Sequence, residues 1–412
     1  MDGMGSAGAQ SNGSDSHERW TAPRPVAFWL VAAAFAVTML GTTLPTPLYV
    51  LYQRELRFST LMITVIYAAY AVGVLAALLL FGRVSDEIGR RRALLPGLAA
   101  SLLSAVVFLV QHDSLELLFA GRVLSGLSAG IFTGTATAAL VDLAGERGTE
   151  RASLVATVVN MAGLGSGPLL AGVLAQLAPA PLRLPYAVDI ALLLAVTAGV
   201  WFMPEPVRTA VRRPRLRVTR PSVPPEVRGT FTRAAIAGFA GFAVLGLFTA
   251  VAPSFLGSVL GLHSFALSGG VVFSVFAAST VGQIVLVPRF GEASLPVGCA
   301  GLVIGMALLT AGLAVESFGI FLTAGLVAGL GQGMSFRAGL AAVNAKAPPD
   351  QRAGVASTFF IVIYVALSLP VVGEGLATDA VGLRTAGIGF SVAVAVLAGS
   401  VLTALLRAGR TA

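Results

Sequence analysis

Side chains that could carry out covalent chemistry are scarce in this sequence. Only 11% of the 412 residues are charged, and the chain has three histidines, one lysine and one cysteine. The lysine, Lys346, follows an alanine, so it cannot belong to a phosphate-binding loop, in which glycine precedes lysine. The lone cysteine, Cys299, excludes an internal disulfide and a cysteine-based metal site. The sequence shows no nucleophile paired with a base, so we expect no catalytic residues, no cofactor, no metal site and no enzyme.

Three ionisable residues lie inside long apolar segments, namely Arg122, Asp189 and Glu374. Such residues are costly in a membrane, about 2.5 kcal/mol or more for an arginine, and they point to function. The topology derived below places all three in the outer third of the membrane. We therefore predict a proton-coupling cluster, with Asp189 or Glu374 carrying the proton. The alternative role for Arg122 is a structural arginine bonded to backbone carbonyls.

Membrane-spanning helices must position these side chains. The mean hydropathy is +0.87 and 56% of the residues are apolar, too many for a surface in water. Apolar stretches long enough to cross about 30 Å of hydrocarbon occur at twelve places: 26–50, 60–81, 93–110, 116–141, 152–177, 185–203, 234–256, 267–287, 295–315, 318–343, 353–376 and 383–406. They are apolar on every side, unlike the alternating strands of a membrane barrel. The sequence thus predicts an all-α membrane protein with 12 transmembrane helices.

Basic residues predict the orientation of these helices. The connections on one side, together with both tails, hold 22 of the 27 lysines and arginines, and those on the opposite side hold four. Lysine and arginine accumulate on the cytoplasmic side of membrane proteins, so both termini should be cytoplasmic. The arginine-rich, lysine-poor composition is typical of a GC-rich bacterial genome. We therefore expect a multi-pass protein of a bacterial plasma membrane.

The chain divides into two halves of similar pattern. We expect a disordered tail over 1–24, a six-helix bundle over 25–203, a basic linker over 204–233, a second bundle over 234–406 and a tail over 407–412. GLSAG at 126–130 matches GLGQG at 329–333, at an offset near half the chain length. Duplicated, pseudo-symmetric bundles favour a transporter that rocks about a central site. The linker is rich in arginine and holds a single aromatic residue, Phe231, too few for base stacking, so it predicts contact with anionic lipid and no nucleic-acid binding.

The second connection carries the most specific motif, GRVSDEIGRRR over residues 82–92. It resembles the signature loop of the major facilitator superfamily, G-x-x-x-D-x-x-G-R-[RK]-x. The resemblance implies the major facilitator fold and a conformational latch on the cytoplasmic side. Its residues would be Gly82, Asp86, Gly89, Arg90 and Arg91.

The fifth span contains a second motif, formed by Gly163, Gly167, Pro168 and Gly172. Small residues four apart let helices pack backbone to backbone, and a proline within a helix bends it. The spacing resembles the antiporter pattern of the same family, with Ala171 replacing one glycine. The first span carries Pro45 and Pro47, which resemble the family's first-span P-x-P feature and predict a helix break.

Few charges lie near mid-membrane, so the central cavity should suit neutral or amphipathic cargo. Side chains that could line it share aromatic or amide character; they are Phe35, Tyr49, Phe132, Asn160, Phe248, Gln283, Gln332, Phe359 and Tyr364. Packing bulk, or contact with lipid, is the alternative role for the aromatic ones.

The preferred hypothesis is a secondary transporter that exports a small lipophilic or amphipathic compound, such as a drug, antibiotic or metabolite, in exchange for protons. The alternative is a proton-coupled importer of a small neutral nutrient such as a sugar. A receptor or scaffold would need an added soluble domain, which we do not find in the sequence. The expected partners are the small-molecule substrate, protons and the bilayer, and we expect the protein to act as a monomer.

Overall fold

The computed structural model describes residues 22–81, 84–111, 113–145, 148–206, 221–348 and 351–408, except for the side chains at positions 81, 84, 86 and 353. The tail at 1–21, most of the linker and residues 409–412 lie outside the described residues. The first half contains α1 (Arg24–Thr43), η1 (Thr46–Leu48), α2 (Tyr49–Leu56), α3 (Thr60–Phe81), α4 (Val84–Ile88), α5 (Arg90–Val110), α6 (Leu115–Ala144), α7 (Thr149–Leu177) and α8 (Leu184–Trp201).

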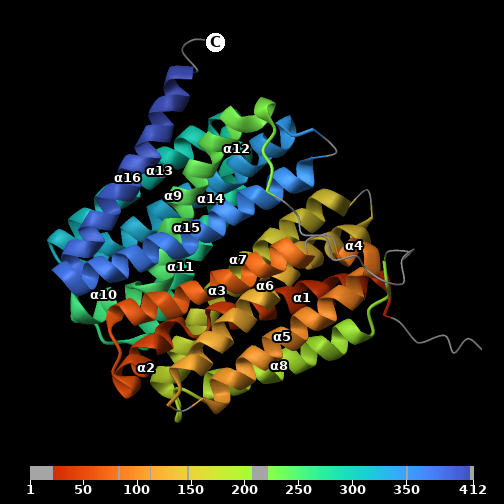
Figure 1. Cartoon of the computed structure of the whole chain (residues 1–412), viewed down its shortest axis with the longest axis horizontal. Coiled ribbons are helices and arrows are strands. Elements are labelled where there is room, and N and C mark those ends of the chain that lie inside the picture. The colour runs from red at the N-terminus through yellow and green to blue at the C-terminus, as the bar shows by residue number, and fades with distance from the viewer. Residues whose placement is uncertain are drawn as a thin grey trace, which may run out of the picture.

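The second half begins with η3 (Pro225–Val227) and α9 (Arg228–Ala250). It continues with α10 (Ala252–Ser258), α11 (Phe265–Val281), the π-helical turn η4 (Gly282–Leu286), α12 (Val287–Phe290), η5 (Gly291–Ala293), α13 (Ser294–Ala314), α14 (Phe318–Lys346), α15 (Arg352–Val381) and α16 (Leu383–Ala408). The two halves form two helical layers (Figure 1). We call the end near α4 and α12 the linker end, and the opposite end the α2/α10 end.

Eleven stretches of helix are long and apolar enough to cross a membrane, and one of them, Phe265–Ala314, has 50 residues. The contacts of this stretch with α14 show that it crosses the membrane twice. Along α14, Val275 and Ser279 lie against Gly329 and Gly333, so α11 runs parallel to α14. By contrast, α13 runs antiparallel to α14, and the chain reverses near Gly291, whose φ is 50°. The described residues therefore make twelve crossings, which confirms the predicted fold class.

The predicted helix break in the first span is also confirmed. The helix α1 ends at Thr43, and the chain passes through Pro45 and Pro47 in η1 before α2 begins. In the second half, the chain turns between the end of α10 at Ser258 and the start of α11 at Phe265. In the first half it is the two prolines that break the helix.

The internal repeat occupies equivalent positions in the two halves. A Cβ added at Gly126 would lie 2.0 Å from the carbonyl oxygen of Tyr70 on α3, and one at the matched Gly329 would lie 2.6 Å from that of Val275 on α11. Only glycine allows helices to approach so closely. The matched glycines of α6 and α14 thus make the same backbone contact in both bundles.

Gly126→Ala should lower the free energy of unfolding by about 1–3 kcal/mol, because its methyl group would overlap backbone atoms that cannot move independently. The matched control is Gly134→Ala on the same helix, where an added Cβ meets nothing within 4 Å. The measurement is the thermal unfolding midpoint of the purified proteins in detergent. Equal midpoints for the two variants would contradict the close contact.

Candidate functional site: a cavity between the two bundles

The two halves touch along two seams at the α2/α10 end. In the first seam, α7 packs on α11: a Cβ at Gly172 would lie 2.2 Å from the Phe265 carbonyl oxygen, and one at Gly269 would lie 2.2 Å from that of Pro168. In the second, α3 packs on α15, where Thr64 lies against Gly375. The α2/α10 end is therefore closed by direct contact of backbone with backbone or small side chains.

Towards the linker end the second seam opens. The rings of Tyr70 and Tyr364 are 6.3 Å apart and form its last aromatic contact. Beyond them lies a cavity of about 440 Å³ between α3, α6 and α15. Its walls carry hydroxyl and apolar groups in about equal number, from Leu78, Ser85, Arg90, Gly130, Ile131, Thr133, Gly134, Thr135, Thr137, Ala138, Ala356, Ser357, Phe360 and Tyr364. A space open at one end and sealed at the other is the arrangement that alternating access requires.

The cavity carries one basic residue, Arg90, whose charge is balanced. Its Nε donates to Asp142 Oδ2 at 2.8 Å, and its Nη1 donates to Ser85 Oγ at 2.8 Å. A paired guanidinium attracts anions less than a free one does. The lining therefore suits a neutral or amphipathic molecule better than a strongly charged one.

The predicted latch lies at this same end. Gly89 has a φ of 102°, which favours glycine. Gly82 and the side chain of Asp86 lie outside the described residues. The backbone N–H groups of Arg90 and Arg91 donate to the carboxylate of Glu205, at 2.7 and 3.1 Å.

Sequence reasoning missed Glu205. The available signal was an acidic residue just after the sixth span, but its partner, Arg90, lies 115 residues earlier in the chain. Anionic groups stabilise helix N-termini, so Glu205 caps α5 and ties the start of the linker to the latch. The linker therefore begins from a fixed point on the first bundle.

Arg122 is buried in the first bundle, with 2% of its surface exposed. Its Nη1 donates to the Thr42 carbonyl oxygen of α1 at 2.5 Å and its Nη2 to that of Tyr67 of α3 at 3.4 Å. Its guanidinium carbon lies 4.8 Å from the ring centre of Tyr70. These bonds match the structural alternative, while the Nε atom has no hydrogen-bond partner among the described residues.

The two predicted acids lie in different bundles. Asp189 on α8 lies against Gly41, where an added Cβ would be 2.8 Å from its Oδ2 atom. Glu374 on α15 accepts a hydrogen bond from Thr378 at 3.1 Å. Each acid is 3% exposed and keeps one carboxylate oxygen without a partner in the described part of the chain. Neither acid forms an ion pair with Arg122 there, so the predicted cluster is not assembled in this conformation.

Among the predicted cavity residues, only Tyr364 lines the open cavity. The rings of Phe35 and Phe132 lie 6.4 Å apart inside the first bundle, and Phe359 packs with Phe231 and Phe336 inside the second. Both pairings match the packing role that we gave as the alternative.

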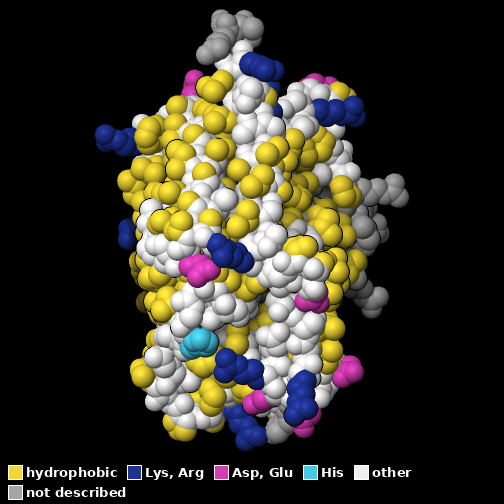
Figure 2. All heavy atoms as spheres, turned by 90° about the vertical axis from the view of Figure 1, so that its left-hand side faces the viewer, with side chains coloured by type: hydrophobic (Ala, Val, Ile, Leu, Met, Phe, Trp, Pro, Cys, Tyr) yellow, Lys and Arg dark blue, Asp and Glu magenta, His cyan; other side chains and the backbone are white. Residues whose placement is uncertain are grey.

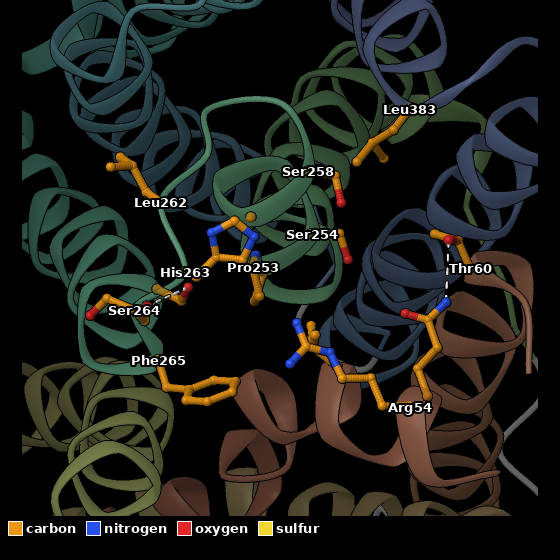
Figure 3. A pocket seen from close by; sticks show the side chains of 14 residues that line it. Arg54, Thr60, Pro253, Ser254, Ser258, Leu262, His263, Ser264, Phe265 and Leu383 are labelled. Carbon is orange, nitrogen blue, oxygen red and sulfur yellow. Dashed lines mark hydrogen bonds between the residues drawn. The ribbon is translucent and has the colours of Figure 1, made fainter. Parts of the chain in front are cut away.

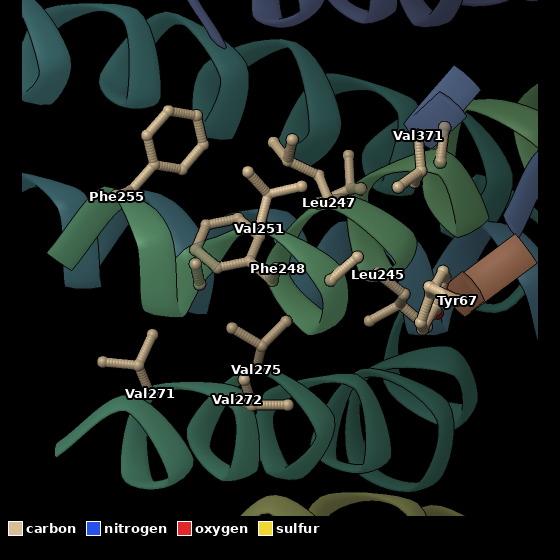
Figure 4. Packing of buried hydrophobic residues seen from close by; sticks show 14 of the residues in the cluster. Tyr67, Leu245, Leu247, Phe248, Val251, Phe255, Val271, Val272, Val275 and Val371 are labelled. Atoms are coloured by element: carbon tan, nitrogen blue, oxygen red, sulfur yellow. The ribbon is translucent and has the colours of Figure 1, made fainter. Parts of the chain in front are cut away.

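Phe248 lies in a buried cluster beside Val251 and Val275 (Figure 4). Tyr49 is buried, and its hydroxyl has no partner among the described residues. The half-buried Asn160 likewise leaves its Oδ1 atom without one.

The amides of Gln283 and Gln332 belong to the interior of the second bundle. Ser279 links them, because its hydroxyl donates to Gln332 Oε1 at 2.5 Å and accepts from Gln283 Nε2 at 3.2 Å. Arg337 donates to the carbonyl oxygen of Gln283 at 2.7 Å, within the π-helical turn. These groups join α11 to α14.

A second cavity, of about 270 Å³, lies across the closed end (Figure 3). Arg54 comes from α2 of the first bundle, and Ser254, Ser258 and His263 come from the second. Gln53 donates to Thr60 at 3.4 Å. This pocket collects polar groups of both bundles just outside the seams.

Comparison with known proteins agrees with this architecture. Residues 31–371 match the model of the Major Facilitator Superfamily. Over 93 residues the chain is 36% identical to multidrug resistance protein MdtL of Escherichia coli O139:H28 and of Shigella boydii serotype 18. That match covers 23% of this chain and 24% of each relative, so the chain spans about a quarter of the length of the curated relatives it matches.

Solved structures share the fold over nearly the whole chain. A bacterial homologue of the human lysosomal transporter Spinster, inward-facing and unoccupied, has a TM-score of 0.74 at 14% identity, over 92% of this chain and 96% of that one. The human organic anion transporter MFSD10 (TETRAN) has a TM-score of 0.67 at 15% identity, over 92% of this chain and 100% of that one. The family model covers most of the sequence and the twelve crossings fit it, so this chain belongs to the Major Facilitator Superfamily of membrane transporters, which are not enzymes.

Proposed function

We propose that this transporter exports a small lipophilic or amphipathic compound in exchange for protons. The observation that carries the proposal is the cavity at the linker end, which combines hydroxyl groups, Phe360 and Tyr364 with a paired Arg90. A pocket that combines apolar surface with hydroxyl groups suits such cargo. The partial likeness to MdtL, a multidrug resistance protein, supports the same class of cargo.

The proposal assigns the linker end to the cytoplasm of a bacterial cell. In the topology predicted from the sequence, the connections and tails of that side hold 22 of the 27 basic residues, which the positive-inside rule assigns to the cytoplasm. The conformation described is then open to the cytoplasm, ready to take up cargo. Release needs the α7–α11 and α3–α15 seams to part while the latch end closes.

Asp189 is the proposed proton carrier. It is the only acid within α8, and one carboxylate oxygen lacks a partner among the described residues. Arg122 bonds to α1 at Thr42, the residue after the one that Asp189 contacts. A shift of α1 would therefore act on both ionisable groups at once, which provides a link between protonation and conformation.

The test is uptake of radiolabelled linezolid, a neutral amphipathic drug, into everted membrane vesicles with an acid lumen. We expect accumulation that collapses when the pH gradient is dissipated. Ser357→Leu places bulk in the cavity and should lower the rate roughly tenfold, if the cavity binding is worth about 1.4 kcal/mol. Ser400→Leu, on the exposed surface of α16, is the matched control and should transport normally.

The importer hypothesis predicts transport in the opposite direction. It requires uptake of a labelled neutral nutrient, such as glucose, into intact cells, driven by external acid. Glucose uptake together with no linezolid accumulation would overturn the export proposal while leaving the transporter fold untouched.

A further inference from the structure

A third cavity lies on the outer surface of the second bundle. It measures about 710 Å³ and is bounded by α9, α15 and α16. Of the 14 residues that line it, only Glu374 and Thr385 have polar side chains. We call this space the Glu374 groove.

The carboxyl group of Glu374 is the unusual feature of the groove. The side chain is 3% exposed, Oε1 accepts from Thr378, and Oε2 has no partner in the described residues. A buried carboxylate normally has a cationic or hydrogen-bonding partner, since burying one alone is costly. The described residues therefore leave the hydrogen-bonding capacity of this oxygen unused.

The basic residues of the helices around the groove do not supply that partner in the described structure. Arg384 of α16 binds Glu316 Oε1 at 2.9 Å and the Ala314 carbonyl oxygen. The other basic residues of these helices, Arg228, Arg233, Arg352 and Arg407, all lie in terminal turns at the linker end. The acid Asp379 is exposed on α15, and α3, which meets α15 near Gly375, has no charged residue.

Glycines provide the space for a ligand. Gly373 on α15 and Gly389 on α16 both line the groove, and a Cβ added to either would meet nothing within 4 Å. The volume is therefore open, and small residues on the two helices create it.

The groove faces the part of the surface that contacts lipid. Leu369, Leu376 and Val396 are 64%, 56% and 67% exposed on α15 and α16. Seen from the α2/α10 end, hydrophobic side chains cover large areas of the surface, with charged groups scattered among them (Figure 2). Glu374 is seven residues before the end of α15, about 10 Å from it at 1.5 Å per residue. A ligand could reach it directly from the bilayer.

We propose that the Glu374 groove binds a monovalent lipophilic cation, an apolar body with one weakly hydrated positive charge, taken from the lipid. The apolar walls accept the body and the single carboxylate balances the single charge. A small metal ion does not fit, because hard cations need about six oxygen ligands and the side chains lining the groove offer one carboxylate and the hydroxyl of Thr385. This site is separate from the cavity of the proposed function and adds a second place where organic molecules bind.

The test uses tritiated tetraphenylphosphonium and the purified full-length protein in lipid nanodiscs. We expect saturable binding that Glu374→Gln weakens roughly tenfold or more, since removing one member of a buried charge pair typically costs 2 kcal/mol or more. Asp379→Asn is the matched control, because it removes an exposed acid of the same helix, and it should bind like the wild type. Tetraphenylborate has the same shape and the opposite charge, and it should not compete.

Two further variants locate the site. Gly389→Leu should fill the groove and weaken binding while the carboxyl group is intact. Ser357→Leu, in the cavity between the bundles, should leave binding unchanged. Wild-type binding by Glu374→Gln or by Gly389→Leu would overturn the proposal, as would loss of binding in Ser357→Leu alone. That last result would place the cation in the central cavity and leave the proposed export function standing.

Discussion

Gly269→Val is expected to reduce transport roughly tenfold or more. At this position α11 of the second bundle lies directly on the Pro168 carbonyl of α7, where even a Cβ atom would be 2.2 Å from the oxygen. Valine must push the bundles apart at the end where they are in contact. Overpacking of this kind costs about 1–3 kcal/mol, and the cost falls on the closed seam alone. The equilibrium should therefore move towards opening of the α2/α10 end.

The neighbouring residue provides a matched control. A Cβ at Gly270 would meet nothing within 4 Å, so Gly270→Val should transport like the wild type. Cys299 is the one native cysteine and is fully buried. Once it is replaced, single reporter cysteines can be introduced without a competing thiol. In the Gly269→Val background, Thr64→Cys should gain reactivity towards an impermeant thiol reagent, and Ser357→Cys should lose it. Unchanged reactivity at both reporters would contradict the role of this seam as a gate.

Asp189→Asn should abolish accumulation driven by a pH gradient, to background level, while exchange of cargo down its own gradient continues. The asparagine keeps the size of the side chain and its contact with Gly41 but cannot release a proton. No other charged residue lies in α1 between Val26 and Thr43, in α5 between Ala93 and Val110, or elsewhere in α8. Arg122 on α6, across α1, is the cation that faces this region.

The measurement compares gradient-driven uptake with counterflow in everted vesicles containing equal amounts of protein. Asp379→Asn, an exposed acid outside the first bundle, is the control and should retain both activities. Full gradient-driven accumulation by Asp189→Asn would remove Asp189 as the proton carrier. Loss of both activities would indicate that the aspartate serves to hold α8 on α1.

The fold was predictable because lipid imposes strong rules on sequence. Uninterrupted apolar runs, the break at Pro45 and Pro47, and the distribution of arginine were enough to predict twelve crossings in two bundles. Helix ends were less predictable, since polar first and last turns continue beyond the hydrocarbon. The predicted span 353–376, for example, becomes α15 from Arg352 to Val381.

The cavity was much harder to predict. An aromatic residue in a membrane helix is equally compatible with lipid, a helix interface or a binding site, because all three are apolar. From the sequence, Phe132 and Phe359 could therefore not be distinguished from Tyr364 as cavity residues, although only Tyr364 lines the cavity. Half of the residues that line the cavity are threonine, serine or glycine, whose presence in a membrane helix carries little information until the neighbouring helix is known.

The halves of the molecule are unequal at one matched position. At the repeat offset, the position equivalent to Arg122 is Gly325, where an added Cβ would lie 3.0 Å from Phe248 and from Val275. The first half thus carries a buried cation at this position, and the second half has only apolar groups there. The proposed proton coupling would then rest on the first bundle, and the interior of the second bundle could change with the cargo without altering it.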